Sequence, residues 1–306
     1  MIPMFSKEIY TERRNRLKQL VGSGIILLHG NDQSSMNYRD NWYHFRQDSS
    51  FLYYCGLDIA NLALVIDVDN NTDMLFGNDA TIDEIVWLGP TPAVSELAAS
   101  SGITATKKMS ELESYLRNAR SGIHFLPPYR AEHYDTLGAL LQLQPAAIDA
   151  GVSISLIKAI VSMRSVKAPE EIIEIDKAVN ITNQMHLAAM TTAIAGETEA
   201  AIAGRLQSIA IAGGGDLSFP TILTQKGETL HIHYTNTVVK PGNMLLCDCG
   251  AQNDKYYAGD LTRTFPVNKT FTQLQREVYS IVLTAQQAAA DALKPGIRYL
   301  DVHLLA

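Results

Sequence analysis

Cysteine is scarce in this sequence, and the few cysteines present do not predict a disulfide framework. Only Cys55, Cys247 and Cys249 occur in 306 residues. The number is odd, and two of the three flank Asp248, whereas domains held by disulfides usually carry an even set. Free thiols are typical of a reducing compartment. We therefore expect a cytoplasmic protein without structural disulfides.

Long apolar runs and basic runs are also missing. No stretch approaches the roughly 18 uninterrupted apolar residues that a membrane-spanning helix needs. The N-terminus carries early charges at Lys7 and Glu8 and lacks the apolar core of a signal peptide. The net charge is −7, which argues against a nucleic-acid partner. We expect neither a membrane nor a nucleic acid as a partner.

The common catalytic signatures are absent as well. The sequence contains no GxSxG, P-loop, HExxH or GxGxxG motif. Serine hydrolases, P-loop nucleotide hydrolases, zincins and Rossmann enzymes therefore lack their signatures here.

The composition suits a two-domain protein with a sizeable core. Hydrophobic residues make up 46% of the chain and charged residues 19%, as in ordinary globular proteins. Residues 1–150 alternate strand-like and helical patterns, which predicts an α/β domain with a mostly covered sheet. We expect a linker helix over residues 151–168. Residues 169–306 read as two helices, several strands and a long helix, which predicts an α+β second domain.

The most informative stretch is residues 244–267. Two segments rich in Leu, Tyr, Thr and Phe surround an Asn-Asp turn, which predicts a β-hairpin. A turn centred there places Asp248 and Asp260 opposite each other, with Cβ atoms about 4.5–5.5 Å apart. Two carboxylates so close repel each other unless a proton or a cation lies between them. We interpret the pair as a candidate metal site. The alternative is that one aspartate caps a turn and the other pairs with Arg263.

Two histidines precede this hairpin. His231 and His233 lie in a segment, residues 230–235, that we expect to be a strand, so both imidazoles point to one face. They are candidates for binding a metal or a substrate. A solvated strand face is the alternative interpretation.

Arg46 lies in an aromatic-rich polar segment and is followed by Gln47 and Asp48. Arg46 and Asp48 are candidates for contacting a substrate or another subunit, and a salt-bridged loop is the alternative. The first domain and this loop lead us to expect a homodimer or a higher homo-oligomer.

Taken together, these motifs resemble the aminopeptidase P and prolidase group of pita-bread metallopeptidases. The resemblance implies an α/β N-terminal creatinase-type domain followed by part of an α+β pita-bread catalytic domain. It is most specific in the metal hairpin, and it covers nearly the whole chain. The matching segments are DCGA at 248–251, YAGDLTRTFPV at 257–267, LHIHYT at 230–235, MRSVKAPEEI at 163–172 and YHFRQDSSF at 43–51.

The resemblance implies an exopeptidase that releases the N-terminal residue from Xaa-Pro peptides by attack of a metal-bound water. It implies two divalent metal ions. Manganese is the expected metal, and zinc, cobalt or magnesium are the alternatives. Asp248 would bind one ion and Asp260 would bridge both. His233 would be the catalytic group that stabilises the substrate or the tetrahedral intermediate. His231 and Arg46 would contact the substrate.

The sequence departs from the family pattern in the number of metal ligands. The family's remaining histidine and two glutamates lie downstream of the matched segments. His303, in the segment DVHLLA, lacks the glycine-rich surroundings of the family's ligand histidine. We therefore expect a C-terminally truncated catalytic domain with little or no activity by itself. Two other functions remain open: a prolidase acting on Xaa-Pro dipeptides, and a metal-free pita-bread module that binds a partner.

Overall fold

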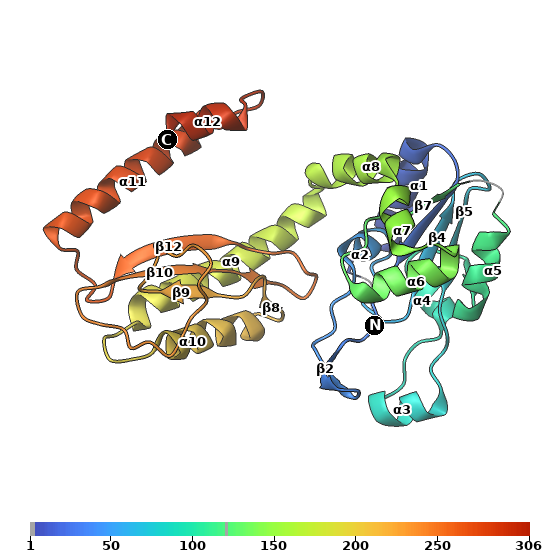
Figure 1. The fold of residues 1–306 in the computed structure, drawn as a ribbon, viewed down its shortest axis with the longest axis horizontal. Helices are drawn as coiled ribbons and strands as arrows, with labels where there is room; N and C mark the ends of the chain where they lie inside the picture. Colours follow the sequence, from blue (N-terminus) through green and yellow to red (C-terminus); the bar gives the residue numbers. More distant parts are fainter. Residues whose placement is uncertain (1–3, 120–121) are drawn as a thin grey trace. The chain divides into compact units, whose positions relative to one another are not determined.

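The computed structural model describes residues 4–119 and 122–306, which divide into a first unit ending at Lys167 and a second unit beginning at Ala168 (Figure 1). The first unit is built on a mixed five-stranded sheet of order β6-β5-β4-β1-β7. Its central strands are antiparallel to each other, and β6 and β7 are added in parallel at the edges. The strands are β1 (Ile25–His29), β4 (Ala63–Asp67), β5 (Thr72–Phe76), β6 (Ala105–Lys107) and β7 (Ile123–His124).

Helices cover both faces of this sheet because its central strands are apolar on both sides. Ile26 and Leu28 of β1 enter one core, whereas Ile25 and Leu27 enter the other. The first core is completed by α1 (Lys7–Val21), α2 (Ser49–Cys55), α4 (Val94–Ser100) and α8 (Ile154–Ser165), and the second by α5 (Leu112–Arg117), α6 (Ala131–Leu141) and α7 (Pro145–Gly151). This arrangement is the covered α/β sheet that the sequence predicts.

The remaining elements of the first unit are short and peripheral. They are β2 (Ser35–Tyr38), β3 (Asn41–Trp42), α3 (Ile82–Leu88) and the 3-10 helix η1 (Met109–Glu111). The segment that we expected to be a linker helix, residues 151–168, contains α8, and α8 is not a free connection. Its Leu156, Ala159 and Ile160 are buried in the core of the first unit.

The second unit packs two helices against one face of a small antiparallel sheet. The helices α9 (Pro169–Thr192) and α10 (Glu199–Ala212) pack on each other and on the sheet β12-β10-β9. Their shared core includes Met185, Leu206, Leu245 and Phe265. The sheet strands are β9 (Ile222–Thr224), β10 (Met244–Cys249) and β12 (Leu261–Pro266), and a separate pair joins β8 (Asp216–Leu217) to β11 (Ala251–Gln252).

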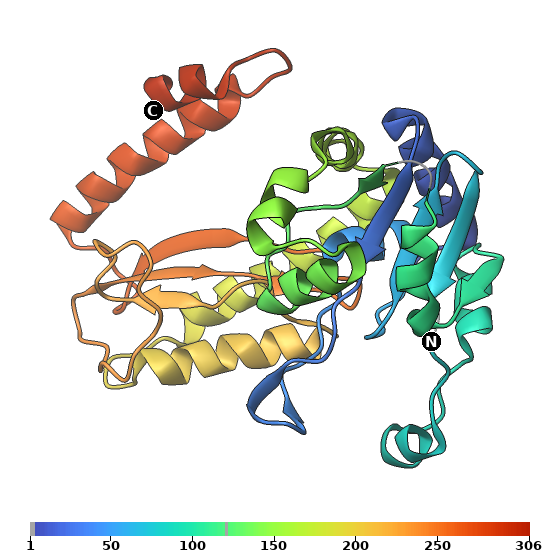
Figure 2. The ribbon, with the colours of Figure 1, turned by 45° about the vertical axis from the view of Figure 1, so that its right-hand side comes forward.

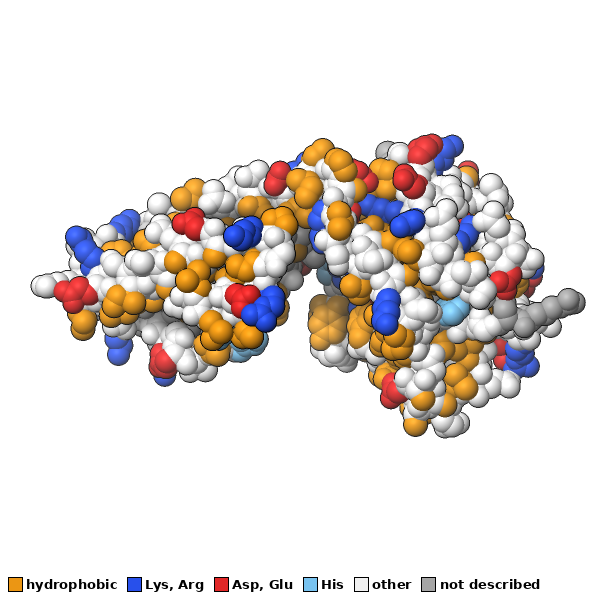
Figure 3. Space-filling model, turned by 90° about the horizontal axis from the view of Figure 1, so that it is seen from above, with side chains coloured by type: hydrophobic (Ala, Val, Ile, Leu, Met, Phe, Trp, Pro, Cys, Tyr) orange, Lys and Arg blue, Asp and Glu red, His pale blue; other side chains and the backbone are white. Residues whose placement is uncertain are grey.

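The long helix α11 (Gln273–Ala292) is amphipathic, yet none of its residues is buried. Leu274 and Ile281 are 71% and 70% exposed, and Val278 and Val282 also face solvent. A groove of about 790 Å³ separates α11 from β12, and α12 (Tyr299–Leu305) follows. The ribbon shows the course of α11 and α12 (Figure 2), and the space-filling view shows hydrophobic side chains among charged ones (Figure 3).

No single helix in the described residues is long and apolar enough to cross a membrane. The helices α7 and α8 reach the length and apolar composition of a membrane-spanning helix only when they are counted together. The chain bends by 57° at their junction.

The exposure of α11 predicts that its apolar residues contribute little to the stability of this chain. Ile281→Ser, which exchanges residues of similar helix propensity, should change the free energy of unfolding by less than about 0.5 kcal/mol. Leu206→Ala, in the core against the sheet, should cost about 2–5 kcal/mol. Urea unfolding followed by circular dichroism measures both. Equal losses in the two variants would show that α11 is packed in solution.

Candidate metal centre

Strand β10 determines the direction of Asp248. Along the strand, Leu245, Cys247 and Cys249 are fully buried against α9 and α10, whereas Leu246 and Asp248 between them are only half-buried. Successive side chains of a strand point to opposite faces. Asp248 therefore projects from the face of the sheet that α9 and α10 do not cover.

Asp260 does not lie directly opposite Asp248, so the register that we predicted is wrong. The residue paired with Asp248 is Thr262. The Gly259 amide donates to the Ala251 carbonyl at 2.9 Å, which continues the same register and aligns Asp260 with Gly250. The hairpin is centred about one residue later than the Asn-Asp pair suggested.

The side chain of Asn253 accounts for this shift. Asn253 is buried, and its Oδ1 accepts hydrogen bonds from the backbone amides of Lys255 at 3.0 Å and Tyr257 at 3.1 Å. Tyr256 between them takes a left-handed conformation with φ of 62°. Asn side chains often fold the chain back on itself in this way. The turn is thus set by side-chain bonding as well as by pairing of the strands.

Helix α9 holds the same turn in place. Glu174, which is 3% exposed, accepts hydrogen bonds from Asn253 Nδ2 and Lys255 Nζ, each at 2.8 Å. The hydroxyl of Tyr257 donates to Glu171 at 3.0 Å. These bonds hold the hairpin against α9, so its register cannot slip without breaking buried charged contacts.

The corrected register keeps Asp248 and Asp260 on one face, as diagonal neighbours. Diagonal residues across an antiparallel pair lie about 7–8 Å apart and remain within reach of each other's side chains. Asp248 Oδ1 is buried and has no hydrogen-bond partner among the described residues. A buried carboxylate oxygen is costly unless it is paired, so this oxygen fits a cation ligand.

The alternative was that one aspartate caps a turn and the other pairs with Arg263. It finds no support in the described part of the chain. Arg263 donates its Nη1 hydrogen bond to the Thr262 carbonyl at 2.7 Å. No ion pair there joins Arg263 to either aspartate. Two carboxylates are nevertheless too few for a hard cation, which takes about six oxygen donors, and no third acidic or histidine side chain is clustered with them among the described residues.

His231 and His233 do not lie on a strand, so that prediction is also wrong. Residues 230–235 form a turn and an irregular loop, and both histidines are exposed. The loop is fixed instead by Glu199, which is 2% exposed and accepts hydrogen bonds from Thr235 N at 3.2 Å and Thr235 Oγ1 at 2.9 Å. The imidazoles of His231 and His233 are exposed on a loop that these hydrogen bonds hold in place, so they are accessible to a ligand.

Arg46 lines a separate groove of about 340 Å³ in the first unit, beside Tyr43, His44 and Glu132. Its Nη2 donates to Ser49 Oγ at 3.1 Å, and its Nη1 donates to the Gln47 carbonyl. Asp48 caps α2 by accepting from the Phe51 amide at 2.8 Å.

A third polar group, which we did not predict from the sequence, lies on the core face of β10. His186 of α9 brings its Nε2 to 3.4 Å from Cys249 Sγ, and Cys247 Sγ lies 3.6 Å from Cys249 Sγ. Hydrogen bonding between the thiols lowers the pKa of Cys249 and raises that of Cys247. Burial acts to lower the pKa of His186, but its contacts with Cys249 raise it overall. Both cysteines thus point away from Asp248 into the core, as the alternation of side chains along a strand requires.

Two family models match the chain. The model of the aminopeptidase P N-terminal domain matches residues 10–124, and that of metallopeptidase family M24 matches residues 174–306. The chain belongs to the aminopeptidase P family. Its creatinase-type first domain and partial pita-bread second domain, expected from the sequence, are thereby confirmed.

Individual members of the aminopeptidase P family are similar over nearly the whole chain. The Xaa-Pro aminopeptidase of Escherichia coli is 28% identical over 311 residues, which cover 97% of this chain and 70% of that protein. A probable Xaa-Pro aminopeptidase of Fusarium vanettenii is 28% identical over 287 residues, which cover 92% of this chain and 60% of the relative. The chain thus spans about 60–70% of the length of these two relatives.

Solved structures agree with this assignment. The structure of E. coli aminopeptidase P with the inhibitor Pro-Leu has a TM-score of 0.86 and 27% identity, covering 98% of this chain and 71% of that one. A zinc-substituted form of the same enzyme in complex with product has a TM-score of 0.85 and 26% identity, with the same coverage.

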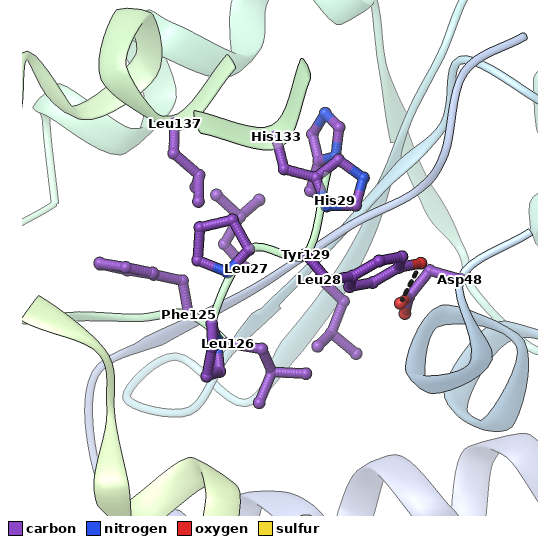
Figure 4. A pocket seen from close by; sticks show the side chains of 11 residues that line it. Leu27, Leu28, His29, Asp48, Phe125, Leu126, Tyr129, His133 and Leu137 are labelled. Atoms are coloured by element: carbon purple, nitrogen blue, oxygen red, sulfur yellow. Dashed lines mark hydrogen bonds between the residues drawn. The ribbon is translucent and has the colours of Figure 1, made fainter. Parts of the chain in front are cut away.

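The first unit of this aminopeptidase P family member also contains a small cavity, lined by apolar side chains and by His29, Asp48, Tyr129 and His133 (Figure 4). Its volume is about 40 Å³, which leaves room for a few water molecules but not for a peptide. His29 and His133 meet edge to face with ring centroids 5.1 Å apart, and Tyr129 donates to Asp48 at 3.1 Å. Burial lowers the pKa of His29 to about 4, and the neighbouring His133 adds to this effect.

The depressed pKa of His29 predicts a loss of stability in acid. In the unfolded chain His29 becomes protonated as the pH falls below its ordinary pKa of 6.5. In the folded chain it stays neutral until the pH approaches its lowered pKa of about 4. Stability is therefore fully present above pH 6.5 and falls as the pH drops from 6.5 to 4, by at most about 3 kcal/mol. His29→Gln should flatten this dependence in urea unfolding, whereas the exposed His44→Gln should retain it. An unchanged slope in His29→Gln would contradict the assignment.

Proposed function

We propose that this chain supplies the first part of the metal site of a Xaa-Pro aminopeptidase, with Asp248 and Asp260 as ligands. The observation that carries the proposal is the buried, unpartnered Oδ1 of Asp248 on the same sheet face as Asp260. Carboxylates suit hard and borderline divalent ions such as Mn²⁺, Zn²⁺ or Mg²⁺. The proposed cofactor is a pair of divalent ions, with manganese as the preferred metal. The zinc-substituted form of the E. coli enzyme supports a divalent metal as the cofactor.

The proposed reaction is release of the N-terminal residue that precedes proline. When bound, the divalent ions supply a water of lowered pKa and polarise the scissile carbonyl. The exposed His233 is the proposed catalytic side chain, and it donates a hydrogen bond to the substrate or to the oxygen that gains charge. His231 beside it is the proposed contact for the peptide. Arg46 in the first unit is a further proposed substrate contact, which its place in a groove supports.

We further propose that the remaining metal ligands come from outside the described residues. Asp248 and Asp260 provide too few oxygens for one hard cation, and still fewer for two. The apolar face of α11 borders the groove of about 790 Å³, whose other wall contains Met244, Thr262 and Thr264. An uncovered apolar face of this kind requires a packing partner. A segment that packs on α11 would lie next to the sheet face that carries the aspartates.

By the same argument the 306-residue chain alone has little or no peptidase activity. A homodimer or higher homo-oligomer and a cytoplasmic location are part of the proposal. The exposed aromatic side chains Tyr43 and Trp42 near Arg46 support self-association, and the free cysteines support a reducing compartment.

Metal binding by the complete gene product tests the ligand assignment. Asp248→Asn removes the buried negative charge and should weaken Mn²⁺ binding, measured by titration with electron paramagnetic resonance detection, at least tenfold. Asp254→Asn is the matched control because Asp254 is exposed at the tip of the same hairpin, and its affinity should equal that of the wild type. Equal Mn²⁺ affinity in all three proteins would exclude Asp248 as a ligand.

Peptidase assays test the proposed reaction itself. The complete gene product, supplied with Mn²⁺, should cleave Xaa-Pro tripeptides, and the 306-residue chain should fall at least a hundredfold short of that rate. A comparison of tripeptides with dipeptides separates an aminopeptidase from a prolidase. Absence of Xaa-Pro cleavage by the complete product would refute the proposed function, and rapid turnover by the 306-residue chain would refute the need for further ligands.

A further inference from the structure

His186, Cys247 and Cys249 form a compact donor cluster inside the core of the second unit. All three residues are buried, and one donor atom from each lies within 4.8 Å of the other two. Cys247 and Cys249 alternate with Asp248 on β10, so their sulfur atoms lie on the face of the strand opposite to its carboxylate. His186 reaches them from α9, which packs directly on that face. The cluster is therefore separate from the proposed peptidase site.

The distances within the cluster match the edges of a metal coordination polyhedron. The sulfur atoms are 3.6 Å apart, and Cys249 Sγ is 3.4 Å from His186 Nε2. Thiolate–metal bonds of about 2.3 Å place two sulfur ligands about 3.8 Å apart around a tetrahedral ion and about 4.0 Å apart around a trigonal ion. An outward movement of a few tenths of an ångström would therefore accommodate an ion. A disulfide would require the sulfur atoms to approach to about 2.05 Å, which is a much larger change.

A second observation shows that the cluster is not satisfied as a simple hydrogen-bonded core. His186 Nδ1 is buried and has no hydrogen-bond partner among the described residues. Its Nε2 makes a long contact of 3.3 Å with the Cys249 carbonyl and another of 3.4 Å with the Cys249 sulfur, and the Leu261 backbone also interacts with the ring. Ligation of Nε2 would replace these long contacts with one bond of about 2.0 Å.

The donor types select a soft cation. Two sulfur ligands and one imidazole suit Cu(I) and Zn²⁺, whereas Mn²⁺ and Mg²⁺ prefer oxygen. Structural zinc takes four ligands, but no fourth Cys, His, Asp or Glu joins the cluster in the described part of the chain. Cu(I) accepts three donors in one plane and so suits this cluster better than zinc does.

We propose that His186, Cys247 and Cys249 bind one soft cation, Cu(I), on the core face of the strand that carries Asp248. The ion would link β10 to α9 at a point where they are joined by apolar packing and by the long contacts of His186 with Cys249. Because the folded state holds the three donors together, it would bind the ion more tightly than the unfolded chain does, and the ion would stabilise the second unit. The site depends on no ligand of the peptidase centre, and the two faces of β10 would hold ions of different chemistry.

Anaerobic titration with Cu(I) in competition with a coloured Cu(I) chelator tests this proposal on the 306-residue chain. The wild type should retain one equivalent of Cu(I) and show a higher melting temperature. Cys247→Ser and Cys249→Ser should each lower the affinity at least a hundredfold. Cys55→Ser is the matched control, because Cys55 is an equally buried thiol in the other unit, and it should retain the wild-type affinity.

Two further measurements keep the test decisive if a cysteine variant fails to fold. X-ray absorption of the wild-type Cu(I) protein should show two sulfur scatterers and one nitrogen scatterer. Asp248→Asn should leave the Cu(I) affinity unchanged, which separates this site from the proposed peptidase function. No retained Cu(I), an equal loss in Cys55→Ser, or a spectrum without two sulfur atoms would overturn the proposal.

Discussion

The alternation of side chains along β10 is the constraint on which the second unit depends. Leu245, Cys247 and Cys249 are buried against α9 and α10, and Asp248 is consequently directed to the other face. A slip by one residue would exchange the two faces and bury the carboxylate in the apolar core, at a cost of several kcal/mol. Core packing therefore positions a charged side chain that makes no contact with that core.

A second constraint fixes the partner strand. Asn253 closes the turn through its own side chain, and Glu174 of α9 binds Asn253 and Lys255. Together they set the register that places Asp260 diagonally across from Asp248. The distance between the two carboxylates is thus determined at the far end of the hairpin, by groups that would not touch a metal or a peptide.

The sequence predicts features that depend on local patterns and misses those that depend on distant contacts. The apolar run around Asp248 indicates the strand and the direction of its cysteines correctly. The register is missed because Asn253 bonds amides beyond the expected turn. The strand expected around His231 is a loop because the buried Glu199 bonds Thr235 where strand pairing was expected. The cluster brings together His186 and Cys249, which are 63 positions apart in the sequence. A local sequence pattern cannot predict a contact between residues so far apart.

The central claim is that the open face of β10 is a site for hard divalent ions. Anomalous X-ray scattering from crystals of the complete gene product grown with Mn²⁺ tests it most directly. Manganese peaks are expected within bonding distance of Asp248 Oδ1 and of the Asp260 carboxylate, on the face opposite Cys247. Manganese bound elsewhere, with Asp248 and Asp260 free of it, would contradict the account.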